Sequence, residues 1–266
     1  MSPLWNKSLC LHIAAEQLHL SVQPGWLQQK GWLRAHAADA QTLAPAGIEI
    51  RCALLQPLPQ ALDALFTQVQ QQTALRRARL RVTLADAHVH FDVVRGDFAA
   101  CSTQQIEAIA QSCLAELLGD DATSQRLRWQ LQPDGRHLLL CAMDGLLVDT
   151  LVQLAAQHGL RLDSLQPALC QHWSQHSSAL PEGSGVFTLA DGGHSLSLCA
   201  QRGSITALSR GRDSAAPSLD QRVNRMLASL GAQAQAVGGF VLVARDPAAW
   251  APTPRWTLRD WQEQAP

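Results

Sequence analysis

One loop of this sequence brings together a carboxylate, two glycines, an imidazole and a hydroxyl: Asp191-Gly192-Gly193-His194-Ser195. The spacing fits neither a Gly-x-x-x-x-Gly-Lys-Ser/Thr phosphate loop nor a Gly-x-Ser-x-Gly nucleophile turn, and no helix start follows it. Glycines directly after an aspartate are typical of a tight turn between two strands. The loop is therefore predicted to be a hairpin turn and not a catalytic loop.

Two pairs of histidines have spacings that metal sites use. His88 and His90 would lie on the same face of a strand, and His172 and His176 are one helical turn apart. The first pair has no identifiable third ligand, and the second has no glutamate between its members as zinc proteases do. We expect the first pair on a polar strand face or at a protein-contact edge, and the second at a polar helix end. The sequence predicts no metal site.

The acidic residues that stand close together are Asp120-Asp121, and Asp144 with Asp149. The first pair follows a helix-ending glycine, and Asp144 is placed to cap a helix. Neither has a basic or metal-binding partner nearby in the sequence, so general acid–base catalysis is not expected. Asp86 and Asp92, which have the same strand parity as the first histidine pair, are expected to be solvated.

The composition is that of a soluble globular protein. The formal net charge is −1, with no basic face for nucleic acid or acidic lipid. No secretory signal and no apolar stretch of roughly 20 residues is present, so we expect no membrane insertion. The seven cysteines form no C-x-x-C pair and are predicted to be reduced thiols in a cytoplasm: Cys10, Cys52, Cys101, Cys113, Cys141, Cys170 and Cys199.

The elements that would position these residues show an internal repeat. Gly185–Leu208 is predicted to form three short antiparallel strands, with turns at Asp191-Gly192-Gly193 and Gln201-Arg202-Gly203. Leu11-His12-Ile13-Ala14 matches Phe187-Thr188-Leu189-Ala190 at an offset of 176 residues, and at the same offset Leu20 and Val22 match Leu196 and Leu198. Such an offset predicts two lobes of similar plan, each beginning with a hairpin.

The first lobe is predicted to begin with the strands Leu9–Ala14 and Leu18–Val22, with a third strand within Trp26–His36. A helix follows from Leu58, with an apolar stripe of Leu58, Leu62, Leu65, Phe66 and Val69. Strands are then expected at Arg79–Leu84 and His88–Val94.

The next helix begins at a capping box made by Ser102 and Gln105. Its apolar stripe is predicted to be Ile106, Ile109, Cys113, Leu114 and Leu117. A hairpin of Leu127–Gln132 and His137–Ala142 follows, joined by the turn Pro133-Asp134-Gly135-Arg136.

Gln175–Gly185 is polar and rich in Ser, Pro and Gly, and we place the lobe boundary there. The domains are residues 1–178, with a subdomain inserted at about 79–143, and residues 179–266. The second lobe adds a helix capped by Ser218 with Gln221 and a buried strand at Gly239–Arg245. Asp246–Pro266 is expected to be a tail packed on the surface and not another element.

The predicted order of elements resembles the duplicated ribonuclease-H-like plan of actin-type ATPases. That order is three strands, a helix, a strand, a helix and a strand, and it begins twice in the chain. The chain is more specifically similar to PilM-type pilus assembly proteins and the cytoplasmic domain of GspL-type secretion proteins. The residues that carry this resemblance are Leu11–Val22, Arg79–Leu84, Leu138–Trp173 and Phe187–Leu198. The fold class it implies is α/β (α+β), an actin-like two-lobe fold with an abbreviated second lobe.

The resemblance also shows which nucleotide-binding residues are absent. Actin-like ATPases place Asp-x-Gly in the first hairpin of each lobe, where glycine lets amides approach phosphates and aspartate positions magnesium and water. Here the positions carry His12 and Ala14, then Thr188 and Ala190. We expect no ATPase activity, no tight nucleotide binding and no cofactor. Asp191 would replace a lost aspartate only if its turn were distorted.

The leading hypothesis is a non-catalytic cytoplasmic scaffold of a type IV pilus or related secretion machine. The resemblance implies that it binds the N-terminal cytoplasmic tail of an inner-membrane, PilN-like partner, and so lies at the membrane through that partner. The groove carried over from the family lies near the Leu84–Asp92 hairpin, with Leu84, His88, Val89, His90 and Phe91 as protein-binding residues.

Two other functions remain as alternatives, an active actin-like ATPase of the same machinery and a sugar-kinase-like enzyme. Both need the aspartates that are missing from the two hairpins. The sequence leaves self-association as a homodimer open, and it does not identify the machine that is served.

Overall fold

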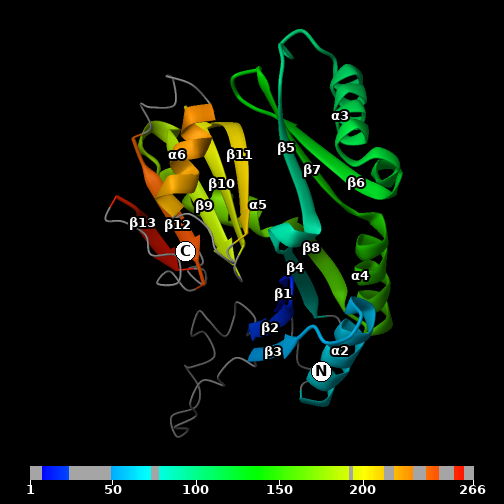
Figure 1. Ribbon diagram of the computed structural model, residues 1–266. Coiled ribbons are helices and arrows are strands. Elements are labelled where there is room, and N and C mark those ends of the chain that lie inside the picture. Colours follow the sequence, from blue (N-terminus) through cyan, green and yellow to red (C-terminus); the bar gives the residue numbers. More distant parts are fainter. Residues whose placement is uncertain are drawn as a thin grey trace, which may run out of the picture. The chain divides into compact units, whose positions relative to one another are not determined.

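The computed structural model of the chain describes residues 8–23, 49–72, 78–191, 194–212, 219–229, 238–245 and 255–260. Contacts divide the chain into two compact units, residues 1–84 with 146–166 and residues 85–145 with 167–266. The strands form three sheets, two of five strands and one of three (Figure 1). The predicted boundary at residue 178 separates the two five-stranded sheets, whereas the compact units group the three-stranded sheet with the second of them.

The first unit is built on a sheet with the strand order β3-β2-β1-β4-β8. The central strand β1 is antiparallel to β2 and parallel to β4, and β2 is antiparallel to β3. Apolar residues that alternate along β1, β2 and β4 are fully buried, so the predicted strands are confirmed. The strands are β1 (Ser8–Ile13), β2 (Gln17–Gln23), β3 (Glu49–Ala53), β4 (Arg79–Leu84) and β8 (Arg161–Pro167).

Two helices belong to the same unit, α2 (Leu58–Gln72) and α4 (Gly145–Gln157). The residues of α2 that are buried, Leu62, Leu65, Phe66 and Val69, are four of the five in the predicted stripe. The two helices are linked where Nε2 of His158 lies 2.8 Å from Oδ1 of Asp63.

The third strand that the structure describes in this sheet is one that the sequence did not predict. The predicted segment, Trp26–His36, lies outside the described residues, and the third position is taken by β3, which pairs with β2. All side chains of β3 are at least partly exposed. A short strand with so little apolar burial has a weak sequence pattern, so periodicity did not reveal it.

The second five-stranded sheet has the order β11-β10-β9-β12-β13, the same plan as the first. β9 is antiparallel to β10 and parallel to β12, as β1 is to β2 and β4. This repetition confirms the predicted duplicated actin-like fold. The strands are β9 (Gly185–Asp191), β10 (His194–Gln201), β11 (Ser204–Arg212), β12 (Phe240–Ala244) and β13 (Thr257–Asp260).

The two hairpins do not match at one constant offset. Leu11 pairs with Leu20 in the first hairpin, but Phe187 pairs with Leu198 in the second. The second hairpin therefore carries two more residues between its paired positions. Leu20 corresponds to Leu198 and not to Leu196, and the single offset of 176 residues holds for the first strand of the hairpin only.

The segment predicted to be a surface tail contains the last strand of the second sheet. β13 pairs in parallel with β12. Trp256, just before it, is buried in the core with Leu242, and its ring lies edge-on to Phe240 at 5.3 Å. The helix α6 (Leu219–Ser229) covers the same core through Val223 and two neighbours. Its predicted cap, Ser218, lies outside the described residues.

The three-stranded sheet, with the order β5-β7-β6, is inserted after β4 (Figure 1). The insertion therefore starts at Ala85 and not at residue 79, because Arg79–Leu84 is a strand of the first sheet. Its strands and helix are β5 (Val89–Arg95), α3 (Thr103–Leu118), β6 (Gln125–Leu131) and β7 (His137–Asp144), with 3-10 turns at Asp86–His88 and Gly119–Ser124.

The start of α3 is as predicted, with both hydrogen bonds of the Ser102–Gln105 capping box present. Its buried stripe is Ile106, Ala110 and Leu114, so the inclusion of Leu117, which is 51% exposed, was wrong. After the insertion come α5 (Ala168–His176) and 3-10 turns at Ser177–Ala179 and Pro181–Gly183. Within the described part of the chain, no helix is both long enough and apolar enough to cross a membrane.

Candidate functional site

The first hairpin closes in a tight turn. The amide of Ala14 donates to the carbonyl of Gln17 at 2.9 Å, which leaves only Ala15 and Glu16 between the strands. His12, on the central strand, is 6% exposed and lies opposite His19. The amide of Ala14, where the actin-like pattern has glycine, is thus used within the turn.

The second hairpin uses the corresponding position inside the sheet. Thr188 is fully buried, and its hydroxyl lies 2.8 Å from the hydroxyl of Ser197, its partner across the hairpin. Ala190 is also fully buried. The hydroxyl of Thr188 is therefore satisfied inside the sheet, as a buried polar group requires.

Asp191, the carboxylate considered as a replacement, has a basic partner. Its Oδ1 lies 2.9 Å from Nε of Arg245, which follows β12, and both side chains are largely buried. The carboxylate is therefore neutralised by the neighbouring strand end of its own sheet. Gly192 and Gly193 lie outside the described residues.

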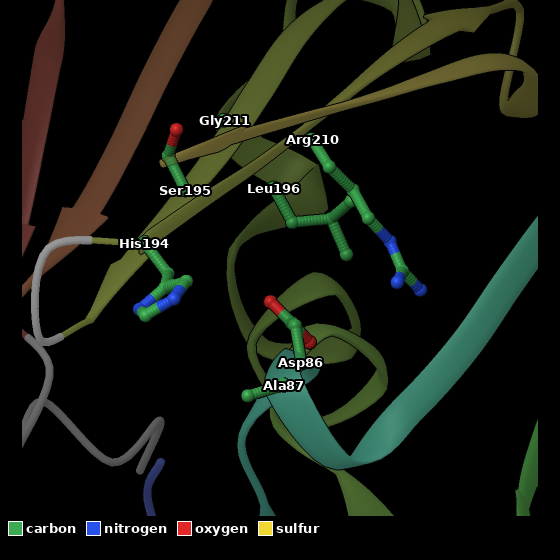
Figure 2. Close-up of a pocket in the computed structure, with 7 residues that line it drawn as sticks. All are labelled: Asp86, Ala87, His194, Ser195, Leu196, Arg210 and Gly211. Atoms are coloured by element: carbon green, nitrogen blue, oxygen red, sulfur yellow. The ribbon is translucent and has the colours of Figure 1, made fainter. Parts of the chain in front are cut away.

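A pocket of about 300 Å³ lies beside β10 and β11 in the second unit (Figure 2). Asp86 and Ala87 come from the 3-10 turn that opens the insertion, while the remaining wall is formed by the two strands. Figure 2 shows the carboxyl group of Asp86 directed toward these strands, between His194 on one side and Arg210 on the other. The lining residues are Asp86, Ala87, His194, Ser195, Leu196, Arg210 and Gly211.

Asp86 is the residue of this pocket with the most altered acidity. Burial raises the pKa of its carboxyl group from 3.8 to about 7. The Arg210 guanidinium and the Leu169 amide lower this pKa, but by less than burial raises it. Its Oδ1 has no hydrogen-bond partner among the described residues. A carboxyl group that is half protonated near neutrality is a weak magnesium ligand, because magnesium requires the ionised form.

Two thiols lie near this carboxyl group, Cys141 on β7 and Cys170 on α5. Burial raises the pKa of Cys141 to about 12 and the pKa of Cys170 to about 11. Both sulfurs are therefore protonated at neutral pH and are poor nucleophiles. Among the described residues, no cluster of three or more His, Cys, Asp or Glu side chains is arranged to hold a metal ion.

The other histidines and carboxylates are spread over separate elements. His88 lies in the 3-10 turn before β5, so it does not share a strand face with His90. His172 and His176 are buried in α5, which ends at His176, with nearly parallel rings whose centroids lie 6.0 Å apart. Asp120-Asp121 is exposed in a 3-10 turn.

The predicted protein-binding residues are mostly interior. Leu84, Val89 and Phe91 are at most 8% exposed, so their side chains support the fold. His90 is exposed and His88 is partly exposed. These five residues stay a prediction, but substitution of the three buried ones would test stability before it tested binding.

Asp86 and Arg210 are the residues of this region that sequence reasoning missed. Asp86 was expected to be solvated, since it stands in a turn between two predicted strands. Its burial comes from β10, β11 and α5, which follow it by more than 80 residues in the sequence. No local pattern carries that information.

Comparison with solved structures shows the same fold in two assembly proteins. The cytoplasmic domain of EpsL, an inner membrane component of the type II secretion system of Vibrio cholerae, aligns with a TM-score of 0.51 at 14% identity, over 97% of this chain and 87% of that chain. A structure of the PilM–PilN type IV pilus biogenesis complex aligns with a TM-score of 0.55 at 12% identity, over 91% and 81%. No protein-family model and no curated protein matches the sequence. At these identities the likeness shows the fold, which is the actin-like fold that the sequence predicts.

Proposed function

We propose that this chain is a non-catalytic scaffold of a type IV pilus or related secretion machine. It binds the cytoplasmic segment of an inner-membrane, PilN-like partner and is held at the cytoplasmic face of the membrane by that contact. The actin-like fold that it shares with EpsL and with the PilM–PilN complex supports the setting. Fold alone does not carry the role, which has to be argued from the site.

The observation that carries the proposal is the hydroxyl pair of Thr188 and Ser197. In an actin-like ATPase the first of these positions holds an aspartate for magnesium and water. Here the pair is buried and its two oxygens lie 2.8 Å apart, so the position serves cohesion of the hairpin. The tight turn at Ala14 supports the same conclusion for the first hairpin.

The nearby pocket does not supply a substitute for the missing groups. Its carboxyl group, Asp86, has a pKa raised by burial to about 7, and Asp191 is paired with Arg245. A magnesium–triphosphate needs ionised carboxylates and amides that approach the phosphates closely. A protein of this fold that lacks such carboxylates and amides is suited to binding a partner protein and holding it in place.

Two measurements on the full chain test the proposal. Equilibrium titration with a fluorescent ATP analogue and magnesium should show no binding at micromolar concentrations, and no phosphate release should exceed the background. A pull-down should retain the N-terminal cytoplasmic tail of a PilN-like inner-membrane protein.

Micromolar binding of magnesium–ATP with turnover would overturn the non-catalytic part of the proposal. Failure to bind the tail of any PilN-like inner-membrane protein would overturn the scaffold part. Thr188→Val is the control for the nucleotide arm, since it removes the hydroxyl and should leave the absence of ATP binding unchanged.

A further inference from the structure

The three-stranded sheet has two edge strands, β5 and β6. β11 packs against β5, where Nη2 of Arg210 donates to the carbonyl of Val89 at 2.6 Å. Just beyond the end of β6, the amide of Ile205 on β11 donates to Oε1 of Gln132 at 2.9 Å. β6 is the other edge of the sheet, and no described strand pairs with its outer side. An open edge is a template for another extended chain.

The ladder identifies which backbone groups of β6 are free. The amide of Gln132 donates to His137, so this pair is of the hydrogen-bonded type. Antiparallel pairs alternate between hydrogen-bonded and non-hydrogen-bonded, so every second residue of β6 back from Gln132 bonds to β7. The amides and carbonyls of Leu127 and Trp129 therefore point outward, away from the sheet.

A groove of about 560 Å³ runs between α3 and β6 on one face of this edge. Leu114 and Ala115 of α3 and Leu127 of β6 form its apolar wall. On the same face, the indole nitrogen of Trp129 donates to the carboxylate of Glu107, so that charge is already engaged. A strand added to β6 would direct every second side chain into this groove, where an apolar side chain fits.

The edge is also basic. Arg126 and Arg128, which line the same groove, are both exposed and stand two residues apart, so their side chains lie on the same side of the strand. The side chain of Arg128 makes no hydrogen bond or ion pair with any of the described residues. The residues of an added strand that face these two arginines would be favoured as acidic, because opposite charges directly across a strand pair stabilise it.

The same charges disfavour two of the registers in which a second copy of the chain could pair with β6. Two β6 strands paired antiparallel about Leu127 would place Arg126 against Arg128, and pairing about Arg128 would place that arginine against itself. Like charges directly opposite each other destabilise a strand pair. An acidic peptide meets no such penalty.

We infer that the outer edge of β6, with the groove beneath α3, is a strand-addition site for an extended peptide of a partner protein in which acidic and apolar residues alternate. The identification of this peptide with the membrane partner's tail rests on the proposed function, but the edge itself does not. The site differs from the predicted groove at the Leu84–Asp92 hairpin, whose strand β5 packs against β11.

A labelled seven-residue peptide of alternating Glu and Val, read by fluorescence anisotropy, tests the edge directly. It should bind the full chain, while the matched peptide of alternating Lys and Val should bind at least about tenfold more weakly. N-methylation of alternate amides, which removes backbone donors and keeps the charge, should abolish binding. Equal binding of the Glu and Lys peptides, or of the methylated peptide, would overturn the inference.

Variants of the chain place the site. Arg128→Glu should weaken binding of the Glu peptide by about tenfold or more, whereas Arg95→Glu, the same charge change on the opposite strand of the sheet, should leave it unchanged. Leu127→Pro removes an outward amide that the sheet does not use and should abolish binding. If both glutamate variants weaken binding equally, the attraction is non-specific and the inference fails.

The membrane partner's tail separates this inference from the proposed function. Tail binding that is weakened by Arg128→Glu supports both. Tail binding that is weakened by His90→Glu and not by Arg128→Glu places the partner at the predicted groove and overturns the identification of the occupant. If the Glu peptide binds and no membrane-protein tail binds, the strand-addition site at β6 is supported and the proposed function is overturned. Sedimentation that shows a dimer lost in Leu127→Pro would identify a second copy as the occupant instead.

Discussion

The two five-stranded sheets have the same strand order but bury different groups at the corresponding place on their central strands. In the first sheet that place is His12, which faces His19, and the hairpin turns directly after Ala14. In the second it is Thr188, whose hydroxyl is paired with Ser197. The fold has been kept while the residues that would make it an ATPase differ from the actin-like pattern in both copies.

This difference shows that topology and chemistry depend on different residues. The strand order depends on apolar side chains that alternate along the strands, since these decide which face is buried. One polar position per hairpin is not needed for that burial and is free to change. A polar group that stays buried must find a partner, and the second hairpin provides one from its own neighbouring strand.

The edges of the two sheets differ as well. β3, at the edge of the first sheet, has no fully buried residue, and its Glu49 interacts with His19 and Arg51. β11, at the edge of the second sheet, is covered by the insertion through Gln132 and Arg210. The second sheet thus protects an edge with a subdomain, where the first uses charged side chains on a short strand.

The largest effect is expected from returning a carboxylate to the second hairpin. Thr188→Asp places a charge at a fully buried position and removes the bond to Ser197, so it should lower the free energy of unfolding by more than about 3 kcal/mol. Denaturant unfolding measures this, and His12→Asp is the matched change in the first copy. Magnesium–ATP binding gained by either variant would contradict the account of the hairpins.

The next effect concerns the covered edge of the second sheet. Gln132→Leu leaves the buried amide of Ile205 without its acceptor, which should cost about 2 kcal/mol in unfolding free energy. Hydrogen exchange at Ile205 should accelerate in the variant. Gln130→Leu, an exposed change on the preceding strand, serves as the control and should shift stability by less than about 0.5 kcal/mol.

Asp86 should make stability depend on pH. Burial holds its pKa near 7 in the folded protein against 3.8 ordinarily, so the folded state binds the proton more tightly than the unfolded chain. Its contribution to stability is full below about pH 4 and is lost as pH rises to about 7. Asp86→Asn should therefore stabilise the protein at pH 8 by at least about 1.4 kcal/mol, the equivalent of one pKa unit, and much less at pH 5.

That comparison is made by denaturant unfolding of both proteins across the pH range. A gain of equal size at pH 5 and pH 8 would show that Asp86 does not titrate in this window. A loss at pH 8 would show that the charged carboxylate stabilises the pocket.

The smallest effect is expected at the turn between β10 and β11. Arg202 and Gly203 both have positive φ, 51° and 80°, as a two-residue hairpin turn requires. A Cβ atom at position 203 would meet no neighbouring atom, but alanine disfavours the positive φ of this position. Gly203→Ala should therefore lower the free energy of unfolding by about 1 kcal/mol. Thermal unfolding of both variants measures this. Arg202→Asn should leave stability unchanged or raise it slightly, and an equal loss of stability in Gly203→Ala and Arg202→Asn would contradict the assigned turn.

Local sequence was enough to predict much of this fold. The hairpin turns at Gly135 and Gly203, the capping box of α3 and the buried stripe of α2 were all predicted within a few residues. Each depends on residues close together in the chain, whose preferred conformations do not require the rest of the molecule. The duplication was predicted on the same basis, from two similar hairpins.

The candidate site was harder to predict, since its members are distant in sequence. Asp86 was expected to be solvated, β13 was taken for a tail and β3 was not recognised. In each case the outcome depended on a neighbouring strand or helix that the local pattern does not name. The departure from the Asp-x-Gly pattern at His12 and Thr188 was readable directly, because it is a statement about residue types.

By itself, therefore, the sequence determined the alternation of buried and exposed residues, the turns and the departure of the two hairpins from the actin-like Asp-x-Gly pattern, all of which are properties of short segments. Only the tertiary structure decided which strands lie at sheet edges and which elements surround Asp86. The physical reason is that desolvation and edge pairing arise from elements that meet in space after long stretches of chain, and neither leaves a local signal.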